Sequence, residues 1–305
     1  MAESQSKSPQ DRAPQPKKFF IFGQGISFSM SPVIHGAAFK HHGLPHVYEI
    51  LQTQTVDELL PVIESPDFGG ASVTMPHKLT IRQYCSSVSS HAKAIGAINT
   101  LVVVPPTQIS DQRGIKGDNT DWSGLVACLK SKGGDAIEDA TTGLVIGAGG
   151  AARAALYALY QLGIKNILLV NRTHSKAEKI ATDYSSVFKI TVLPTLARLS
   201  EMQRPDIIIS TIPADKITTE YFPASLFGKK IGVCVDMAYK PRETPLLKVA
   251  KEQKGWATVS GAQVLLEQAF DQSQLWLGLP APKEFMANEL MIEDEKRAVE
   301  LNGKL

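Results

Sequence analysis

One stretch in the second half of the chain restricts the fold more than any other. It reads "TTGLVIGAGGAARAALYALYQLG", residues 141–163, and "IKNILLVNRT", residues 164–173, follows directly. An apolar run ending in glycines, an alanine- and leucine-rich run closed by a glycine, and a second apolar run predict the order strand, helix, strand. Such a unit is typical of α/β folds, because parallel strands need a crossover connection, usually a helix.

Strand-like and helix-like runs also alternate through the rest of the chain. The runs "KKFFIFG", "GGASVTM", "DIIISTIP" and "KIGVCVDMAY" have the apolar character of strands, and "SKAEKIATDYSS" is typical of a helix. Near the C-terminus, "SGAQVLLEQAFDQSQLWLG" has the apolar spacing of a helix with Leu265, Leu266, Phe270 and Leu277 on its buried face. The sequence therefore predicts an α/β architecture with parallel strands, and its 305 residues are enough for two domains.

Composition excludes several classes of protein. The formal net charge of +2 is too small for a nucleic-acid-binding surface. No apolar run approaches the roughly 20 residues that cross a bilayer, and the N-terminus lacks the apolar core of a signal peptide. We therefore expect a cytoplasmic protein with neither a nucleic acid nor a membrane as partner. Residues 1–17, rich in Ser, Pro, Gln and Lys, predict a disordered tail or linker.

The cysteines and histidines indicate neither a disulfide framework nor a metal site. The three cysteines are odd in number and share no C-x-x-C spacing, so we expect reduced, packed thiols. Five histidines of the first half lack metal-ligand spacing, so surface or packing roles are expected for His35, His41, His42, His46 and His77.

The glycine-rich turn after the strand predicts a nucleotide site. Gly147 and Gly149 permit a tight turn and close approach of the backbone to a pyrophosphate, and Ala152 stands at the third position of the fingerprint. The helix that follows then offers its N-terminal amides to the phosphates. A structural turn without a ligand is the alternative.

A basic cluster stands where NAD-binding proteins usually carry an acid. In those proteins an Asp or Glu about twenty residues after the glycines binds the ribose hydroxyl of NAD. Arg172 and Lys176 stand here instead, and they suit the 2′-phosphate of NADP, so NADP is the predicted cofactor. A solvated loop with incidental charge is the alternative. The predicted cofactor-binding residues are Gly147, Ala148, Gly149, Gly150, Ala151, Asn171, Arg172, Thr173 and Lys176.

Several segments, in their present order, resemble the shikimate dehydrogenase family. They are "SFSMSPVIHG", "GGASVTMPHK", "GAINT", "GDNTDWSG", "GAGGAARA" followed by "NRT", "DMAYKPRETPLL" and "LLEQAF". The resemblance covers Lys18 to about Asn288. Phe28 stands where a histidine is common, and Gln263 replaces a usual glycine. Both replacements would alter the rim of the substrate pocket that the resemblance implies.

The resemblance implies two α/β domains with a cleft between them. Residues 18–123 and 259–290 would form the substrate-binding catalytic domain, and residues 124–258 a Rossmann-like NADP-binding domain. Residues 291–305 are expected as a charged C-terminal tail.

The resemblance also implies roles for individual residues. Ser29 and Ser31 would hydrogen-bond the substrate carboxylate, and Lys78 with Asp121 would form the catalytic pair. Further contacts around the substrate hydroxyls and the cofactor are implied for Thr74, Asn99, Asn119, Tyr239 and Gln268. No metal is required.

Without the resemblance, these positions have ordinary alternatives. Most lysines are simply solvated, and Asp121 could serve as the N-cap of the helix "WSGLVACLKSKG". Ser29 and Ser31 could form hydrogen-bonded turns in a loop before a helix.

The activity implied by the resemblance is reversible NADP-dependent reduction of 3-dehydroshikimate to shikimate. Two alternatives stay open. One is a quinate/shikimate dehydrogenase that prefers NAD. The other is a non-catalytic ligand-sensing domain like that of fungal quinate-pathway repressors. The chain is also compatible with being one domain of a larger multidomain polypeptide.

Overall fold

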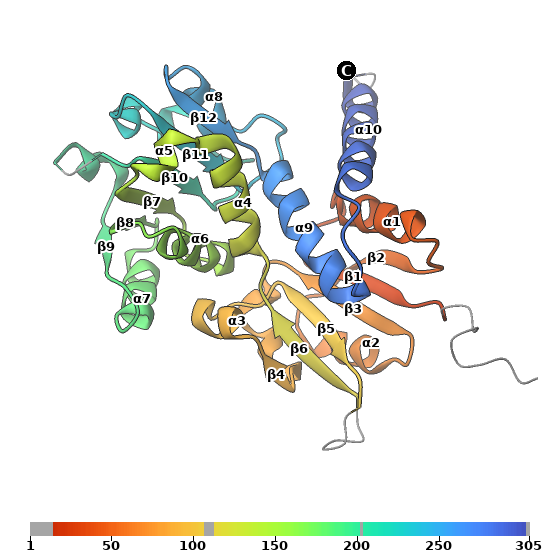
Figure 1. The fold of residues 1–305 in the computed structure, drawn as a ribbon. Helices are drawn as coiled ribbons and strands as arrows, with labels where there is room; N and C mark the ends of the chain where they lie inside the picture. Colours follow the sequence, from red (N-terminus) through yellow and green to blue (C-terminus); the bar gives the residue numbers. More distant parts are fainter. Residues whose placement is uncertain (1–14, 107–112, 202–203, 303–305) are drawn as a thin grey trace, which may run out of the picture.

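The computed structural model describes residues 15–106, 113–201 and 204–302 (Figure 1). Two six-stranded sheets lie side by side, each with helices packed around it. The α/β class predicted from the sequence is confirmed. The prediction of a disordered tail at residues 1–17 falls almost entirely outside the described residues.

The first sheet is mixed and has the order β2-β1-β3-β5-β6-β4. Its strands are β1 (Lys18–Gly23), β2 (Val47–Gln52), β3 (Phe68–Val73), β4 (Ser87–Val88), β5 (Thr100–Val104) and β6 (Gly114–Asp118). The prediction of parallel strands is wrong for β5, which is antiparallel to both β3 and β6. For the pair of β5 and β6 the reason is the short connection 105–113, since a parallel pair needs a crossover of a dozen or more residues.

The second sheet is parallel throughout and has the order β12-β11-β10-β7-β8-β9. Its strands are β7 (Thr142–Ile146), β8 (Asn166–Val170), β9 (Ile190–Leu193), β10 (Ile207–Ser210), β11 (Gly232–Asp236) and β12 (Trp256–Val259). The direction of winding changes between β7 and β10, which are neighbours in the sheet. In open α/β sheets, ligands bind beyond the carboxyl ends of the strands at this switch point.

Helices cover both sheets. They are α1 (Ser31–His41), α2 (Leu60–Glu64), α3 (Ser90–Ile95), α4 (Asp121–Gly133), α5 (Asp135–Glu138), α6 (Gly150–Gln161), α7 (His174–Tyr184), α8 (Pro245–Lys251), α9 (Gly261–Leu277) and α10 (Lys283–Asn302). The predicted strand, helix and strand around the glycines are β7, α6 and β8. Within the described parts of the chain, no helix is both long and apolar enough to span a membrane.

Helices α4 and α9 pack against each other and connect the two halves of the molecule (Figure 1). A glycine makes this contact possible, because a Cβ atom on Gly124 would come within 2.8 Å of the backbone nitrogen of Gln268. The close packing of the two helices brings Gln268 of α9 to the beginning of α4, where Asp121 lies.

The buried face of α9 is less apolar than predicted. Phe270 is buried, while Leu265, Leu266 and Leu277 are only partly buried against neighbouring clusters. The fully buried positions include polar side chains: Gln268, Gln272 and Ser273. The apolar spacing therefore identified the helix but missed its polar inner face.

Helix α10 contains most of the segment expected as a charged tail. Residues 291–302 are helical and continue α10 away from its contact with α1 (Figure 1). An ion pair one helical turn apart, Glu293 with Arg297, supports this part of the helix. The density of charge along the segment reflects an exposed helical surface.

Candidate active site

A buried ion pair lies where the two halves of the molecule meet. Lys78 lies in the 3-10 turn His77–Leu79, after the end of β3, and Asp121 is the first residue of α4. The Lys78 ammonium donates a hydrogen bond to Asp121 Oδ2, and the two side chains are 13% and 7% exposed. The N-cap position belongs to Thr120, so the alternative reading of Asp121 as the helix cap is wrong. Its carboxylate is available to Lys78.

Asn99 connects this pair to α9. Its Nδ2 donates to Asp121 Oδ1 at 2.9 Å and to Gln268 Oε1 at 3.2 Å. The backbone N–H of Thr120 donates back to Asn99 Oδ1 at 2.8 Å. The backbone N–H of Ile98 donates to the Lys78 carbonyl, which fixes the two segments side by side. The structure therefore brings four predicted site residues, Lys78, Asn99, Asp121 and Gln268, into one cluster.

The two predicted serines lie just before and at the start of α1. Ser29 and Ser31 are both buried, and their hydroxyl oxygens are 3.2 Å apart. Tyr239 follows β11 in the other half of the molecule, and its ring lies edge-on to Phe28 with the ring centroids 5.7 Å apart. Burial raises the pKa of Tyr239, and a hydrogen bond with Ser29 opposes that increase. The serines therefore face a tyrosine from across the domain boundary.

Two other predicted residues make backbone contacts. Asn119 donates to the Ala97 carbonyl at 2.9 Å and accepts from the N–H of Asp121 at 3.0 Å, so it shapes the start of α4. Thr74 is half-buried, and its N–H donates to the Phe22 carbonyl between β3 and β1.

The glycine-rich turn has the backbone expected of a phosphate site. Gly147 has a φ of +117°, a conformation that side chains rarely adopt. No atom lies within 4 Å of a Cβ built on Gly149, so the turn opens to free space at the start of α6. Ala152 is fully buried, consistent with close packing of the helix on the sheet. Ala148 and Ala151 lie in the same turn and helix start.

The basic cluster lies at the carboxyl end of β8, the neighbour of β7. Asn171 Nδ2 donates to the Thr173 carbonyl at 2.8 Å, which holds the loop before α7. The side chains of Arg172, Thr173 and Lys176 are exposed. They lie one strand away from the glycine-rich turn, because β8 pairs with β7.

A polar network behind the cluster was not predicted. Gln272, one helical turn after Gln268, donates to Thr100 Oγ1 at 2.9 Å and accepts from Ser72 at 2.8 Å. Thr100 in turn donates to Asn99 Oδ1 at 2.6 Å. The spacing of four residues from Gln268 was the signal in the sequence, because it places both amides on one helix face.

The predicted packing role of two histidines is supported by their positions. His35 is fully buried between the rings of Tyr48 and Trp276, and burial lowers the pKa of His35 to about 3. His77 is buried, and its Nε2 lies 3.0 Å from Thr53 Oγ1. No metal-binding group of His, Cys, Asp or Glu side chains occurs among the described residues.

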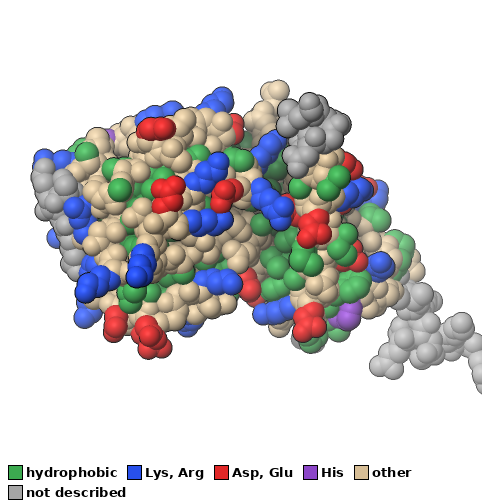
Figure 2. Space-filling model, turned by 90° about the horizontal axis from the view of Figure 1, so that it is seen from above, with side chains coloured by type: hydrophobic (Ala, Val, Ile, Leu, Met, Phe, Trp, Pro, Cys, Tyr) green, Lys and Arg blue, Asp and Glu red, His purple; other side chains and the backbone are tan. Residues whose placement is uncertain are grey.

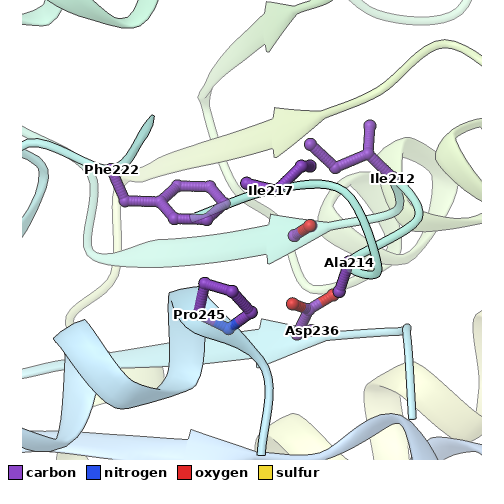
Figure 3. Close-up of a pocket in the computed structure, with 7 residues that line it drawn as sticks. Ile212, Ala214, Ile217, Phe222, Asp236 and Pro245 are labelled. Carbon is purple, nitrogen blue, oxygen red and sulfur yellow. The ribbon is translucent and has the colours of Figure 1, made fainter. Parts of the chain in front are cut away.

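A small pocket lies inside the half with the parallel sheet (Figure 3). Ile212, Phe222 and Pro245 line it together with the carboxylate of Asp236, which ends β11. Burial raises the pKa of Asp236 to about 6, against the opposing hydrogen bonds of Thr244 and the Ala238 N–H. This pocket is separate from the Lys78 cluster and holds none of the predicted site residues.

The fold and the cluster together define a class of protein. The second sheet has the strand order of dinucleotide-binding domains, and the glycine-rich turn lies at its switch point. A second α/β half meets it at a buried lysine–carboxylate pair. The molecule is thus a two-domain α/β protein with a Rossmann-type half and a polar site between the halves.

Comparisons with known proteins identify the family. The family model described as "Shikimate dehydrogenase substrate binding domain" matches residues 21–101. The model described as "Shikimate / quinate 5-dehydrogenase" matches residues 130–244. A solved shikimate 5-dehydrogenase from Mycobacterium fortuitum is 32% identical, with a TM-score of 0.75 over 91% of this chain and 99% of that one. The chain belongs to the shikimate dehydrogenase family.

Fungal relatives are longer than this chain. The pentafunctional AROM polypeptide of Malassezia globosa is 43% identical over 88% of this chain, which spans 17% of that polypeptide. The quinate repressor protein of Emericella nidulans is 38% identical over 91% of this chain, which spans 35% of the repressor. The chain therefore matches a part of each of these proteins.

Solved relatives differ in their bound nucleotide. Shikimate 5-dehydrogenase from Thermus thermophilus, solved with NADP(H) and shikimate, is 27% identical with a TM-score of 0.71, over 90% of this chain and 98% of that one. Quinate dehydrogenase from Corynebacterium glutamicum, solved with NAD, is 25% identical with a TM-score of 0.77, over 91% and 99%.

Proposed function

We propose that this protein is an NADP-dependent shikimate dehydrogenase that reduces 3-dehydroshikimate to shikimate and also catalyses the reverse reaction. The observation that carries the proposal is the buried pair of Lys78 and Asp121 beside the start of α6. An ammonium held by a carboxylate next to a nucleotide site is suited to proton transfer during hydride transfer.

Lys78 is the proposed proton-transferring group. In the reducing direction it gives a proton to the ketone oxygen while the carbon accepts the hydride, and in the oxidising direction it takes that proton back. Asp121 holds the ammonium by its hydrogen bond and keeps it oriented. Because both side chains are largely excluded from water, their mutual interaction is stronger than that of an exposed pair.

The proposed substrate contacts surround this pair. Ser29 and Ser31 offer two neighbouring hydroxyl groups to a carboxylate, and Tyr239 adds a third from the opposite half. Asn99 and Gln268 carry amides, which can donate to and accept from ring hydroxyls. We assign supporting roles near the substrate to Thr74 and Asn119.

The residues at the nucleotide site fit a dinucleotide. The turn leaves space for a pyrophosphate at Gly149, and the N-terminus of α6 supplies backbone N–H groups. A nicotinamide cofactor held there would supply the hydride. Arg172 and Lys176 supply positive charge for a 2′-phosphate, which favours NADP over NAD.

The second candidate function is ligand sensing without catalysis. It is favoured by the similarity to the quinate repressor protein, which is nearly as close as the similarity to the AROM polypeptide. A sensor could retain Lys78 and Asp121 as ligand contacts. A preference for quinate and NAD is a variant of the catalytic proposal.

One assay separates these functions. Absorbance of the reduced nicotinamide is followed with shikimate or quinate as substrate and NADP or NAD as cofactor, in four combinations. We expect turnover with shikimate and NADP. Absence of turnover in all four combinations, together with shikimate binding measured by calorimetry, would instead establish the sensor. Faster turnover with quinate and NAD would establish the quinate enzyme.

A further inference from the structure

The last helix of the chain contacts the loop that carries the predicted carboxylate-binding serines. Arg297, in the part of α10 beyond its contact with α1, donates a hydrogen bond from Nη1 to the carbonyl oxygen of Phe28 at 2.8 Å. The Nε of the same guanidinium donates to Glu293 at 2.6 Å. The arginine is therefore held by its own helix and bonded to the loop ahead of Ser29.

This bond fixes a peptide unit that leads directly to the site. The peptide between Phe28 and Ser29 has one carbonyl and one N–H. Arg297 holds the carbonyl, and the N–H of Ser29 donates to the Ile26 carbonyl at 2.9 Å. With both polar groups bonded, the plane of the peptide is fixed. The hydroxyl of Ser29 in turn accepts from the N–H of Ser31 at 3.2 Å, so the orientation passes to the second serine.

Residues of the other half of the molecule also contact Phe28. The Lys240 ammonium lies 4.8 Å from the centre of the Phe28 ring, and Tyr239 lies edge-on to that ring. Arg242 also forms an ion pair with Asp294 of α10 at 3.0 Å. Basic and acidic side chains are interspersed along the boundary between the two halves (Figure 2).

Charge alone does not explain this arrangement. Glu293 and Arg297 form an ion pair, so a group farther away experiences little of the Arg297 charge. The side chains of Arg297 and Glu293 are 36% and 24% exposed, so solvent also screens the remaining charge. The hydrogen bond from Nη1 to the Phe28 carbonyl is short-ranged, so it acts on the loop before Ser29 whatever the net charge of the ion pair.

We propose that Arg297 is a positioning residue for the substrate carboxylate: it fixes the Phe28–Ser29 peptide and thereby orients the hydroxyls of Ser29 and Ser31. The proposal rests on the proposed function of these serines. It gives α10 a role in the substrate site through the loop before Ser29.

Steady-state kinetics of Arg297→Met test the proposal. We expect the KM for shikimate to rise about three- to tenfold, the range of a net hydrogen bond, with kcat changed less than twofold. The methyl ester of shikimate lacks the carboxylate charge, so its KM should rise clearly less. Lys296→Met removes the same charge from the neighbouring position of α10 and is the matched control, with KM expected to stay at the wild-type value.

A double mutant and a charge variant sharpen the result. If Arg297 acts through Ser29, the double mutant Arg297→Met/Ser29→Ala should be little worse than the poorer single mutant, whereas independent residues would give multiplied effects. Glu293→Ala should raise the KM, because Arg297 loses its anchor. A lower KM in Glu293→Ala would show that net charge, and not position, matters, and would overturn the proposal.

Two further outcomes decide against it or separate it from the proposed function. Equal KM increases for shikimate and its methyl ester, or a KM increase of the same size in Lys296→Met, would also overturn it. If the wild-type protein binds shikimate without turnover, the proposed function fails, but the same variants then test Arg297 through the Kd for shikimate. Thermal unfolding of each variant identifies any loss of folded protein.

Discussion

Gly150, the first residue of α6, lies directly against Lys78 of the other half of the molecule: a Cβ atom on Gly150 would come within 2.9 Å of Lys78 Cβ. The atom that would be met is close to the backbone of Lys78, not at the flexible end of its side chain. The proposed proton donor and the proposed phosphate site therefore touch, and this contact requires a glycine.

The contact predicts a specific effect of Gly150→Ala. The added methyl group must displace Lys78 from its place beside Asp121, and small displacements of a catalytic group can cost about a hundredfold in rate. We expect kcat to fall at least tenfold. Gly149→Ala is the comparison, because no protein atom lies within 4 Å of its added methyl group. It should raise the KM for NADP instead. The same kinetic defect in both variants would contradict this division of roles.

Replacement of the lysine tests the chemistry itself. A placed acid or base contributes about 10² to 10⁴ in rate, so Lys78→Ala should lose that much of kcat while shikimate still binds through Ser29, Ser31 and Asn99. Asp121→Asn should also be severely impaired, since an amide carries no charge to hold the ammonium. The double mutant should be little worse than the poorer single mutant, because coupled catalytic groups are not additive. A Lys78→Ala enzyme with more than about a tenth of wild-type kcat would assign proton transfer to another group.

The proposed preference for NADP depends on the exposed basic cluster. Arg172→Ala should weaken NADP binding about ten- to a hundredfold, which corresponds to roughly 1.5 to 3 kcal/mol for a hydrogen bond to a charged group. NAD has no 2′-phosphate, so its binding should stay nearly unchanged. Calorimetric titration of both nucleotides measures the two affinities. Equal losses for NADP and NAD would show that Arg172 does not select the phosphate.

The buried carboxylate of Asp236 predicts a pH dependence of stability. Burial raises its pKa from 3.8 to about 6, so the folded state holds this proton more tightly than the unfolded state. The resulting stabilisation is complete below about pH 4 and is lost as the pH rises through about 6. Two pKa units correspond to about 3 kcal/mol, an upper limit for this effect.

Asp236→Asn removes this titration and keeps an acceptor for the Ala238 N–H. Urea unfolding of both proteins at several pH values gives their free energies of unfolding. We expect the stability of the wild type, relative to the variant, to fall between pH 4 and pH 7. Parallel pH profiles for the two proteins would rule out the raised pKa.

Much of the fold could be predicted because its signals are local. The run from β7 through the glycines to β8 has a strand–turn–helix–strand pattern that nearby residues specify by themselves. The antiparallel direction of β5 was missed, because it depends on pairing with β3 and β6 and not on the apolar run. The length of the connection 105–113 was the available clue.

The candidate site was predictable as separate segments but not as a network. The motifs gave Lys78, Asn99, Asp121 and Gln268, which the structure brings together. Arg297 could not be found, because a charged residue in a charged helix resembles any solvated position. Its partner is a backbone carbonyl far away in the sequence, and no side-chain pattern marks such an acceptor.

The packing of α9 against the first half of the molecule has a consequence for synthesis of the chain. Trp276 donates to the Leu101 carbonyl of β5, and Gln272 donates to Thr100 of the same strand, so the first sheet depends on residues near the end of the chain. The strands of the parallel sheet lie between β6 and α9 in the sequence, so that sheet is complete once β12 has been made. As the chain leaves the ribosome, the half with the parallel sheet can therefore fold first. The half with the mixed sheet, although its strands are made earlier, must wait for α9 and α10.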